Sequence, residues 1–144
     1  MAHLELVTGK PELQNGNTPL DFYTAVICMD GVFERDGDKK SFKGNLVISW
    51  PEETYLNICN SILEENHTQY SEELCDVGME LLNMTIGGAK TKISPQGFNI
   101  IMALPNSIVG NEKFLPEKNK EINIKVPFMT KSGKFFMQIN YKEE

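Results

Sequence analysis

The sequence is short of the residues that build metal centres and disulfide frameworks. It has only two histidines, His3 and His67, and three cysteines, Cys28, Cys59 and Cys75. An odd number of widely spaced cysteines fits neither a disulfide framework nor a zinc site, and two distant histidines do not make a histidine-based triad. We therefore expect no metal or cofactor of the chain's own. Because each cysteine has apolar neighbours, we expect three small buried thiols in a reducing compartment.

Positive charge and long apolar runs are also scarce. The chain has 14 Lys and Arg against 20 Asp and Glu, a formal net charge of −6. That balance argues against non-specific binding to nucleic acid or to an anionic membrane, which both need clustered cations. No apolar run follows a basic N-terminus, and no stretch reaches about 18 apolar residues, so neither a signal peptide nor a membrane span is predicted. We expect the chain in the cytoplasm.

What is present is ordinary for one folded domain of 144 residues, with 40% hydrophobic and 24% charged residues. Residues 1–20 are polar and contain glycines and prolines, so we expect an irregular segment there, apart from a short strand at Leu4–Val7. Phe22 to Phe33 predicts a strand, and residues 44–49 predict a second. The charged Asp-Gly turn within residues 34–40 joins the two into an antiparallel hairpin.

Two helices and three more strands are predicted after the hairpin. Pro51 opens the first helix, which should end near Glu65. Ser71 starts the second, and Gly87-Gly88 should stop it, because glycine takes the left-handed cap conformation without strain. Alternating apolar residues predict strands at 98–104, 122–128 and 135–141. This order predicts an α+β domain over residues 1–144, with a largely antiparallel sheet packed by two main helices.

The second helix carries a polar stripe among apolar neighbours. Asp76, Glu80 and Asn83, here called the polar seam, are spaced i, i+4, i+7 and so share one helical face, and Glu73 joins them. The solvated face of any amphipathic helix also explains such a stripe. However, no Lys or Arg stands at i+4, so like charges crowd together, and Asn is a poor interior helix former. The seam is therefore a candidate functional site.

The seam resembles the phosphatase signature of the CheX/CheC chemotaxis family. In that signature Asp or Ser, three residues, Glu, two residues and Asn are followed at a distance by proline, as Asp76, Glu80, Asn83 and Pro105 are here. Twenty-one residues separate Asn83 from Pro105, one fewer than the family's usual spacing. The likeness runs from about residue 26 to residue 141 and is strongest over residues 73–110. Family members generally begin with an amphipathic helix, which residues 1–20 do not resemble.

The resemblance implies a single-site, CheX-like phosphatase, because no second Glu-x2-Asn stands on the first helix. Its substrate would be the aspartyl phosphate of a CheY-like receiver domain, in chemotaxis or other two-component signalling. Asn83 would position the attacking water, as glutamine does in small GTPases. Glu80 would pair with a lysine of the receiver, and Asp76 and Pro105 would support the site. Mg²⁺ would be held by the receiver, and the chain would form a homodimer.

Other interpretations stay open. The same fold can serve as a non-catalytic receiver-binding or flagellar-switch adaptor, or as a domain whose partner is not a chemotaxis regulator. Gly87 to Thr91 faintly resembles a phosphate-binding loop, but the Walker pattern needs Gly directly before Lys and a strand before the loop. The aromatic residues of the C-terminal strands fit alternating core positions better than a binding platform. An exposed edge strand there would be a candidate dimer contact.

Overall fold

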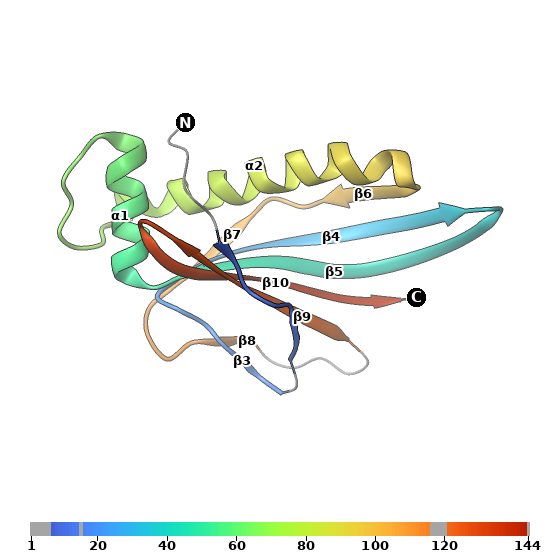
Figure 1. Ribbon diagram of the computed structural model, residues 1–144, viewed down its shortest axis with the longest axis horizontal. Helices are drawn as coiled ribbons and strands as arrows, with labels where there is room; N and C mark the ends of the chain where they lie inside the picture. The colour runs from blue at the N-terminus through green and yellow to red at the C-terminus, as the bar shows by residue number, and fades with distance from the viewer. Residues whose placement is uncertain (1–6, 15, 116–120, 144) are drawn as a thin grey trace.

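The computed structural model describes residues 7–14, 16–115 and 121–143. Its long elements are β4 (Tyr23–Arg35), β5 (Asp38–Trp50), α1 (Glu52–Leu63), α2 (Cys75–Ile93), β9 (Ile122–Thr130) and β10 (Gly133–Glu143). The short strands are β1 (Val7–Thr8), β2 (Glu12–Leu13), β3 (Thr18–Pro19), β6 (Phe98–Met102), β7 (Asn106–Val109) and β8 (Phe114–Leu115). Two 3₁₀ turns, η1 (Glu72–Leu74) and η2 (Ser94–Gln96), flank α2 (Figure 1).

The predicted hairpin is confirmed, with a tighter turn than expected. β4 and β5 pair from Tyr23 opposite Trp50 to Arg35 opposite Asp38, which leaves only Asp36 and Gly37 in the turn. Both turn residues have positive φ, 53° and 85°. Two-residue turns of this kind match the right-handed twist of the strands, and Asp-Gly accommodates them well. The long hairpin therefore forms the spine of the sheet.

All strand pairs of the main sheet are antiparallel, in the order β1-β9-β10-β5-β4-β6, with β2 also on β9 and β7 also on β4. The expected α+β class with a largely antiparallel sheet is confirmed. The expectation of an exposed C-terminal edge strand is wrong, because β10 lies between β9 and β5. The edges are instead β6 with β7, and β1 with β2.

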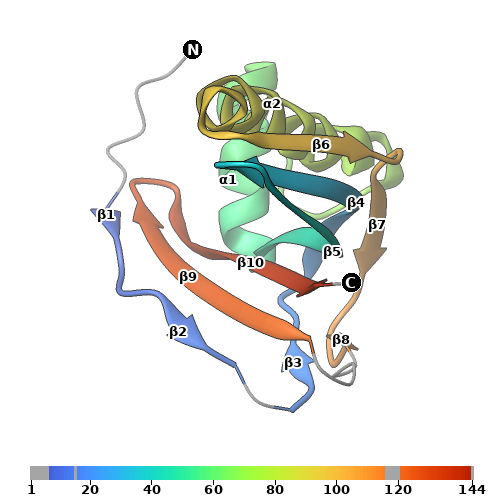
Figure 2. The same ribbon diagram turned by 90° about the vertical axis from the view of Figure 1, so that its right-hand side faces the viewer.

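Both helices cover one face of this sheet (Figure 2). Alternate residues of β4 and β5 point to that face, because side chains in a strand alternate between faces. They form the main core with the apolar sides of α1 and α2: Tyr23, Ala25, Ile27, Leu46, Ile48, Trp50, Tyr55, Leu56, Ile58, Cys59, Leu74, Leu82 and Ile86. Burial of these side chains is what fixes the helices on the sheet.

The opposite face of the sheet has a smaller apolar cluster and a polar network. Leu20, Val47 and Phe136 form the cluster. Beside them, Gln138 Nε2 donates to Thr18 Oγ1 and to the Asn140 side chain, 2.8 Å in each case. Hydrogen bonding of this kind is what allows amide side chains to be buried. The segment with β3 therefore closes this face, although residues 1–20 were expected to be irregular.

Two expectations, one for the N-terminal segment and one for the cysteines, need correction. Within residues 7–14 and 16–19 the chain forms three two-residue strands, because β9 and β8 offer free edges for them; of the strand expected at Leu4–Val7, only Val7 lies within the described residues, and it belongs to β1. Cys59 is buried and Cys75 half-buried, but Cys28 is exposed. In β4 the core face takes Ala25 and Ile27, so the strand period places Cys28 on the other side.

The expected helix stop at Gly87-Gly88 is also wrong. α2 continues through both glycines to Ile93 and is followed by η2. Neither glycine has a positive φ; the left-handed residue that ends this region is Gly97, at φ 103°. Each interior glycine costs a helix about 1 kcal/mol. Packing of Ile86 on the core offsets that local cost, because tertiary contacts supply most helix stability in proteins.

Candidate active site

The polar seam lies on the outer face of α2. Asp76, Glu80 and Asn83 are all exposed. The buried residues of the helix, Gly78, Leu82 and Ile86, recur every four positions on the opposite side. A turn of about 100° per residue separates the mean directions of the two sets by roughly 130°. A carboxylate and a carboxamide therefore point into solvent together, one turn apart.

The seam is acidic and unneutralised. Within the described ranges, neither Asp76 nor Glu80 forms an ion pair with a cation of the chain. Glu73, one turn earlier on the same stripe, is also exposed. Surface carboxylates without partners keep their full charge available for a cationic group of another molecule. The arrangement suits recognition of a partner better than stabilisation of the helix.

Two buried tyrosines hold the first turn of α2. Tyr23 of β4 donates its hydroxyl hydrogen to the carbonyl oxygen of Cys75. Tyr55 of α1 donates to the carbonyl oxygen of Leu74 and accepts from the N–H of Gly78, 2.9 Å away. The two rings stack with centroids 4.0 Å apart. The first N–H groups of a helix lack partners of their own, so the Tyr55 hydroxyl that accepts from Gly78 takes the place of an ordinary side-chain cap.

Gly78 makes this close approach possible. A Cβ added at Gly78 would stand 2.1 Å from Cε1 of Tyr23, a ring that is fully buried. The missing side chain thus lets α2 settle directly on the tyrosine pair. Gly78 stands midway between Asp76 and Glu80, so the contact fixes the rotation of the helix that presents them. Sequence reasoning missed Gly78, Tyr23 and Tyr55; an isolated glycine inside a helix is the signal that pointed to them.

Burial also fixes the protonation of these groups. Desolvation raises the pKa of Tyr23 and of Tyr55 well above that of a free phenol. Both hydroxyls therefore remain protonated, and both keep donating to the backbone of α2. Desolvation likewise raises the pKa of the neighbouring Cys59 thiol to about 11. Cys59 is therefore not an activated cysteine, since a nucleophilic thiol needs a lowered pKa.

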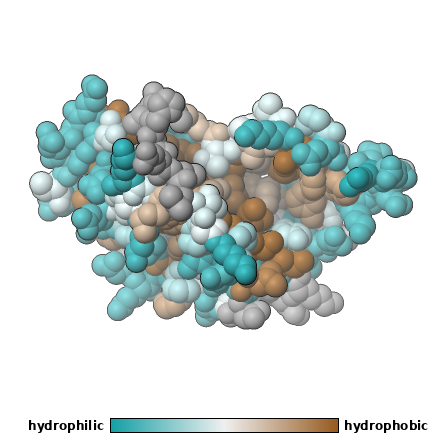
Figure 3. Space-filling model, in the orientation of Figure 1, coloured by the Kyte–Doolittle hydropathy of each residue, from teal (hydrophilic) through white to brown (hydrophobic). Residues whose placement is uncertain are grey.

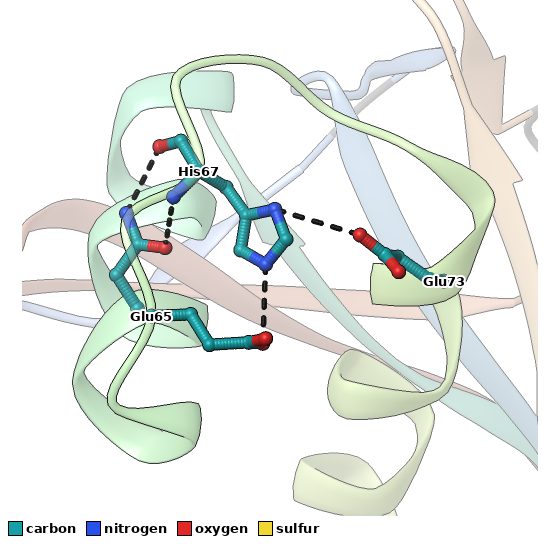
Figure 4. Close-up of polar contacts among 4 residues, drawn as sticks. Glu65, His67 and Glu73 are labelled. Carbon is teal, nitrogen blue, oxygen red and sulfur yellow. Dashed lines mark hydrogen bonds and ion pairs between the residues drawn. The ribbon is translucent and has the colours of Figure 1, made fainter.

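The segment between the helices is tied to both of them through His67 (Figure 4). Its imidazole lies between two carboxylates, with Nε2 3.1 Å from Glu65 and Nδ1 3.6 Å from Glu73. Its backbone N–H donates to Asn60 Oδ1 at 2.7 Å, and its carbonyl accepts from Asn60 Nδ2 at 3.0 Å. Together these contacts connect the end of α1 to η1, directly before the seam.

Pro105 lies in the connection between β6 and β7, beside α2 (Figures 1 and 2). The contact of Cys75 Sγ with Ser107 Oγ, 3.1 Å, joins the first turn of α2 to β7. All four residues predicted for the site therefore belong to α2 or to the strand connection alongside it. Pro105 is half-buried, unlike the three seam residues.

A cavity in the described structure lies elsewhere. About 440 Å³ of space opens beneath the C-terminal half of α2, lined mainly by apolar side chains, including Phe33, Phe42, Ile86, Ile93, Phe98 and Tyr141. Figure 3 shows hydrophobic residues at the hollow below that helix. No seam residue lines this cavity. The seam is thus an exposed helix face outside this cavity, and its side chains are free to enter a pocket of another molecule.

Two further findings concern ligands and membranes. In the part of the chain that the structure describes, no group of three or more His, Cys, Asp or Glu is placed to hold a metal ion. Within the same ranges, no helix combines the length and the apolar character that a membrane span requires.

Comparison with known proteins identifies the family. The family model of the chemotaxis phosphatase CheX matches residues 37–136. The chain belongs to the CheX family of chemotaxis phosphatases. Its class of function, a phosphatase of chemotaxis, follows from that membership and confirms the resemblance read from the seam. No curated protein sequence matches the chain significantly.

Solved structures of the CheX family agree with this assignment. A CheC-like superfamily protein from Shewanella sp. PV-4 is 31% identical, with TM-score 0.82, over 99% of this chain and 87% of that chain. A chemotaxis protein CheX from Vibrio vulnificus is 27% identical, with TM-score 0.81, over 99% and 89%. The CheX of a CheX–CheY–BeF₃–Mg²⁺ complex from Borrelia burgdorferi is 21% identical, with TM-score 0.68, over 95% and 82%, and shows the same fold.

Proposed function

We propose that this chain hydrolyses the aspartyl phosphate of a phosphorylated CheY-like receiver domain, through Asn83 and Glu80. The observation that carries the proposal is that these side chains point outward together from an exposed face of α2 and do not line the cavity beneath that helix. A phosphate buried in a partner's pocket is a substrate that such a face can reach. The Borrelia burgdorferi complex, in which a protein of this fold binds CheY, supports this partner class.

Asn83 acts by positioning. Water attacks phosphorus in line with the bond to the aspartate oxygen; that bond breaks, leaving a free carboxylate and inorganic phosphate. The loose transition state of phosphoryl transfer asks mainly for alignment and charge stabilisation. The Asn83 amide can accept from the water and donate to a phosphoryl oxygen without changing its protonation.

Glu80 acts by docking. Its carboxylate, one turn before Asn83, forms an ion pair with a lysine at the receiver's phosphorylation site, which fixes Asn83 over the phosphorus. Asp76 extends the acidic surface by one turn, and Pro105 stiffens the neighbouring connection. The Mg²⁺ that this chemistry uses belongs to the receiver's own acidic residues, as expected for an ion that prefers carboxylates and phosphate oxygens.

The proposal extends to setting and assembly. The chain acts in the cytoplasm, in two-component signalling, as a homodimer. Because β10 is interior, a dimer contact has to use another surface, and the edges of β6 with β7 or of β1 with β2 are available. Sedimentation of the purified chain measures the mass directly, and a monomer at micromolar concentration would reject the dimer.

The test of the proposed function is phosphate release from a phosphorylated receiver. Asn83→Ala should lower the rate constant by about 10²-fold, the usual cost of removing a positioned polar group, and leave receiver binding intact. Glu80→Lys should weaken binding of the receiver by at least about tenfold, since it places like charges together. Asn99→Ala, an exposed asparagine on β6, is the control and should match the wild type.

The outcomes separate the enzyme from the adaptor. If the phosphate half-life is the same with the wild type, Asn83→Ala and Glu80→Lys, the catalytic assignment fails. If the wild type binds the phosphorylated receiver tightly and releases no phosphate, the chain is a receiver-binding module of the same fold.

A further inference from the structure

We propose that Leu104 and Met84 form a hydrophobic contact surface for the receiver on both sides of the polar seam. This inference rests on the proposed function, since it names further residues that bind the same partner. Leu104 is 86% exposed and Met84 51% exposed, and both are large apolar side chains. A single exposed leucine is normal on a protein surface. The argument therefore depends on where these two residues lie and on how the fold holds them there.

Leu104 lies beside the middle of the seam. After α2 the chain turns back, and β6 and the connection after it run alongside the helix (Figure 1). Met102 and Ile86 line the same cavity, and Ser107 contacts Cys75. From Cys75 to Ile86 the helix rises about 16 Å, and extended chain from Met102 to Ser107 also covers about 16 Å. Leu104 and Pro105 are thus level with the helical turns that carry Glu80.

A bulge pushes Leu104 out of the sheet. β6 pairs Met102 with Met29, and β7 pairs Asn106 with Val26. From Met102 to Asn106 the chain advances by four residues. Over the same stretch the paired strand β4 advances by only three, so one residue is extra. The N–H of Ala103 still donates to the carbonyl oxygen of Cys28, 3.0 Å away, so the extra residue falls at Leu104 or Pro105. Bulges re-aim side chains and are frequent beside active sites.

Pro105 makes this bulge stiff. Proline fixes its own φ and restricts the preceding residue, Leu104, to extended backbone. The exposed leucine is thus held in one backbone conformation before any partner binds. Pre-organised apolar groups bind with less loss of conformational entropy than mobile ones. A flexible surface loop with the same leucine would lack this property.

Met84 flanks the seam from the helix. It stands four residues after Glu80, so the two side chains are neighbours on the helix surface. It is also adjacent in sequence to Asn83, about 100° around the axis. The seam therefore has a polar centre with an apolar residue on each flank. Interfaces commonly surround their functional polar groups in this way, because apolar neighbours exclude water.

The occupant to which we assign this surface is the receiver. The surface formed by Met84 and Leu104 is continuous with Glu80 and Asn83. Any protein that places an aspartyl phosphate at Asn83 therefore also covers Met84 and Leu104. A second copy of the chain at the same place would block the seam. Burial of these side chains therefore belongs to the catalytic complex, and dimerisation is an outcome to be excluded by the test.

The experiment uses the complete chain and the CheY-like receivers of the same cell. Leu104→Ala and Met84→Ala are assayed for phosphate release over a range of receiver concentrations, and for binding to the receiver activated with beryllofluoride and Mg²⁺. Each should raise KM and the dissociation constant by about fivefold to tenfold, as for an apolar interface contact, with kcat unchanged. The matched control is Ile101→Ala: Ile101 is 71% exposed on β6 and alternates away from Ile100 and Met102, which line the cavity under α2.

Several results would overturn the inference. The inference fails if Leu104→Ala and Met84→Ala have the same KM as Ile101→Ala. It also fails if these substitutions change the sedimentation mass without changing KM. A fall in kcat at constant KM would assign these residues to catalysis instead of docking. If the wild type binds the activated receiver and releases no phosphate, the proposed function fails while the binding arm still decides the role of Leu104.

Discussion

The two halves of α2 are packed very differently. The first half, up to about Asn83, lies directly on the sheet: Gly78 touches a tyrosine ring, Leu82 is fully buried, and two phenol hydroxyls bind its first turn. The second half passes over a cavity of about 440 Å³ and shows Gly87, Gly88 and Ala89 to solvent. The polar seam belongs to the closely packed half. α2 is therefore closely packed up to Asn83, the amide that we propose enters a partner's pocket, and is loosely supported beyond it.

The largest effect is expected from Gly78→Ala, which disturbs the packing of the first half of α2. The added methyl group meets the Tyr23 ring at 2.1 Å, and the ring cannot move because it is buried, stacked on Tyr55 and bonded to Cys75. Overpacking of this kind costs about 1–3 kcal/mol, and here exceeds the gain of about 1 kcal/mol from replacing a helical glycine. We expect lower stability to urea and a large loss of phosphatase activity.

Gly87→Ala is the matched control in the loose half. Nothing lies within 4 Å of a Cβ built there, and φ is helical. The substitution should raise the free energy of unfolding by about 0.5–1 kcal/mol, through reduced freedom of the unfolded chain. Urea titration of both variants gives the comparison. Equal effects of the two substitutions would mean that the halves of α2 are not packed differently.

Tyr55→Phe is the next test in size, because it keeps the ring and removes only the hydroxyl. The Gly78 N–H and the Leu74 carbonyl then lose a partner in a buried place. Leaving such groups unsatisfied costs about 1–3 kcal/mol. Differential calorimetry should show a lower unfolding temperature, and kcat should fall more than KM rises, because the helix is less firmly placed. Unchanged calorimetric and kinetic values would show that the hydroxyl does not hold α2.

The same variant has a signature in alkaline solution. Burial raises the pKa of Tyr55 in the native protein above 10.0, the value of a free phenol side chain. The unfolded chain therefore loses this proton first as the pH rises, so native stability falls above about pH 10. Tyr55→Phe removes one contributor to that fall. Its free energy of unfolding should decline less steeply than that of the wild type between pH 10 and pH 11.5.

The seam could be read from the sequence because a helix repeats regularly. Asp76, Glu80 and Asn83 fall on one face whatever surrounds the helix, and the hydrophobic pattern around them is clear enough to place that helix. The hairpin was equally local, since Asp36-Gly37 determines its own turn. Both predictions needed only neighbours within a few residues.

The supports of the seam could not be read in that way. Tyr23 lies 52 residues from Cys75, and Tyr55 lies 23 residues from Gly78, so their contacts exist only once the sheet and both helices have assembled. The bulge at Leu104 depends on the register of β6 and β7 against β4. The glycine pair was misread for the same reason, since Gly87-Gly88 stops an isolated helix and not one whose next turns are packed on β6.

Filling the cavity under α2 tests the loose half directly, with an effect similar in size to that of Gly87→Ala. Ala89 lines the cavity next to Ile86, Ile93 and Phe98, and the space of about 440 Å³ has room for a larger aliphatic side chain. Ala89→Leu should raise the free energy of unfolding by about 0.5–2 kcal/mol, the usual range for cavity-filling changes. The kcat of phosphate release should stay as in the wild type, because the added contacts lie two turns beyond Asn83. A drop in kcat with higher stability would mean that the loose half moves during catalysis, and the rigidity that Gly78 and the tyrosines confer would then be only one part of how α2 works.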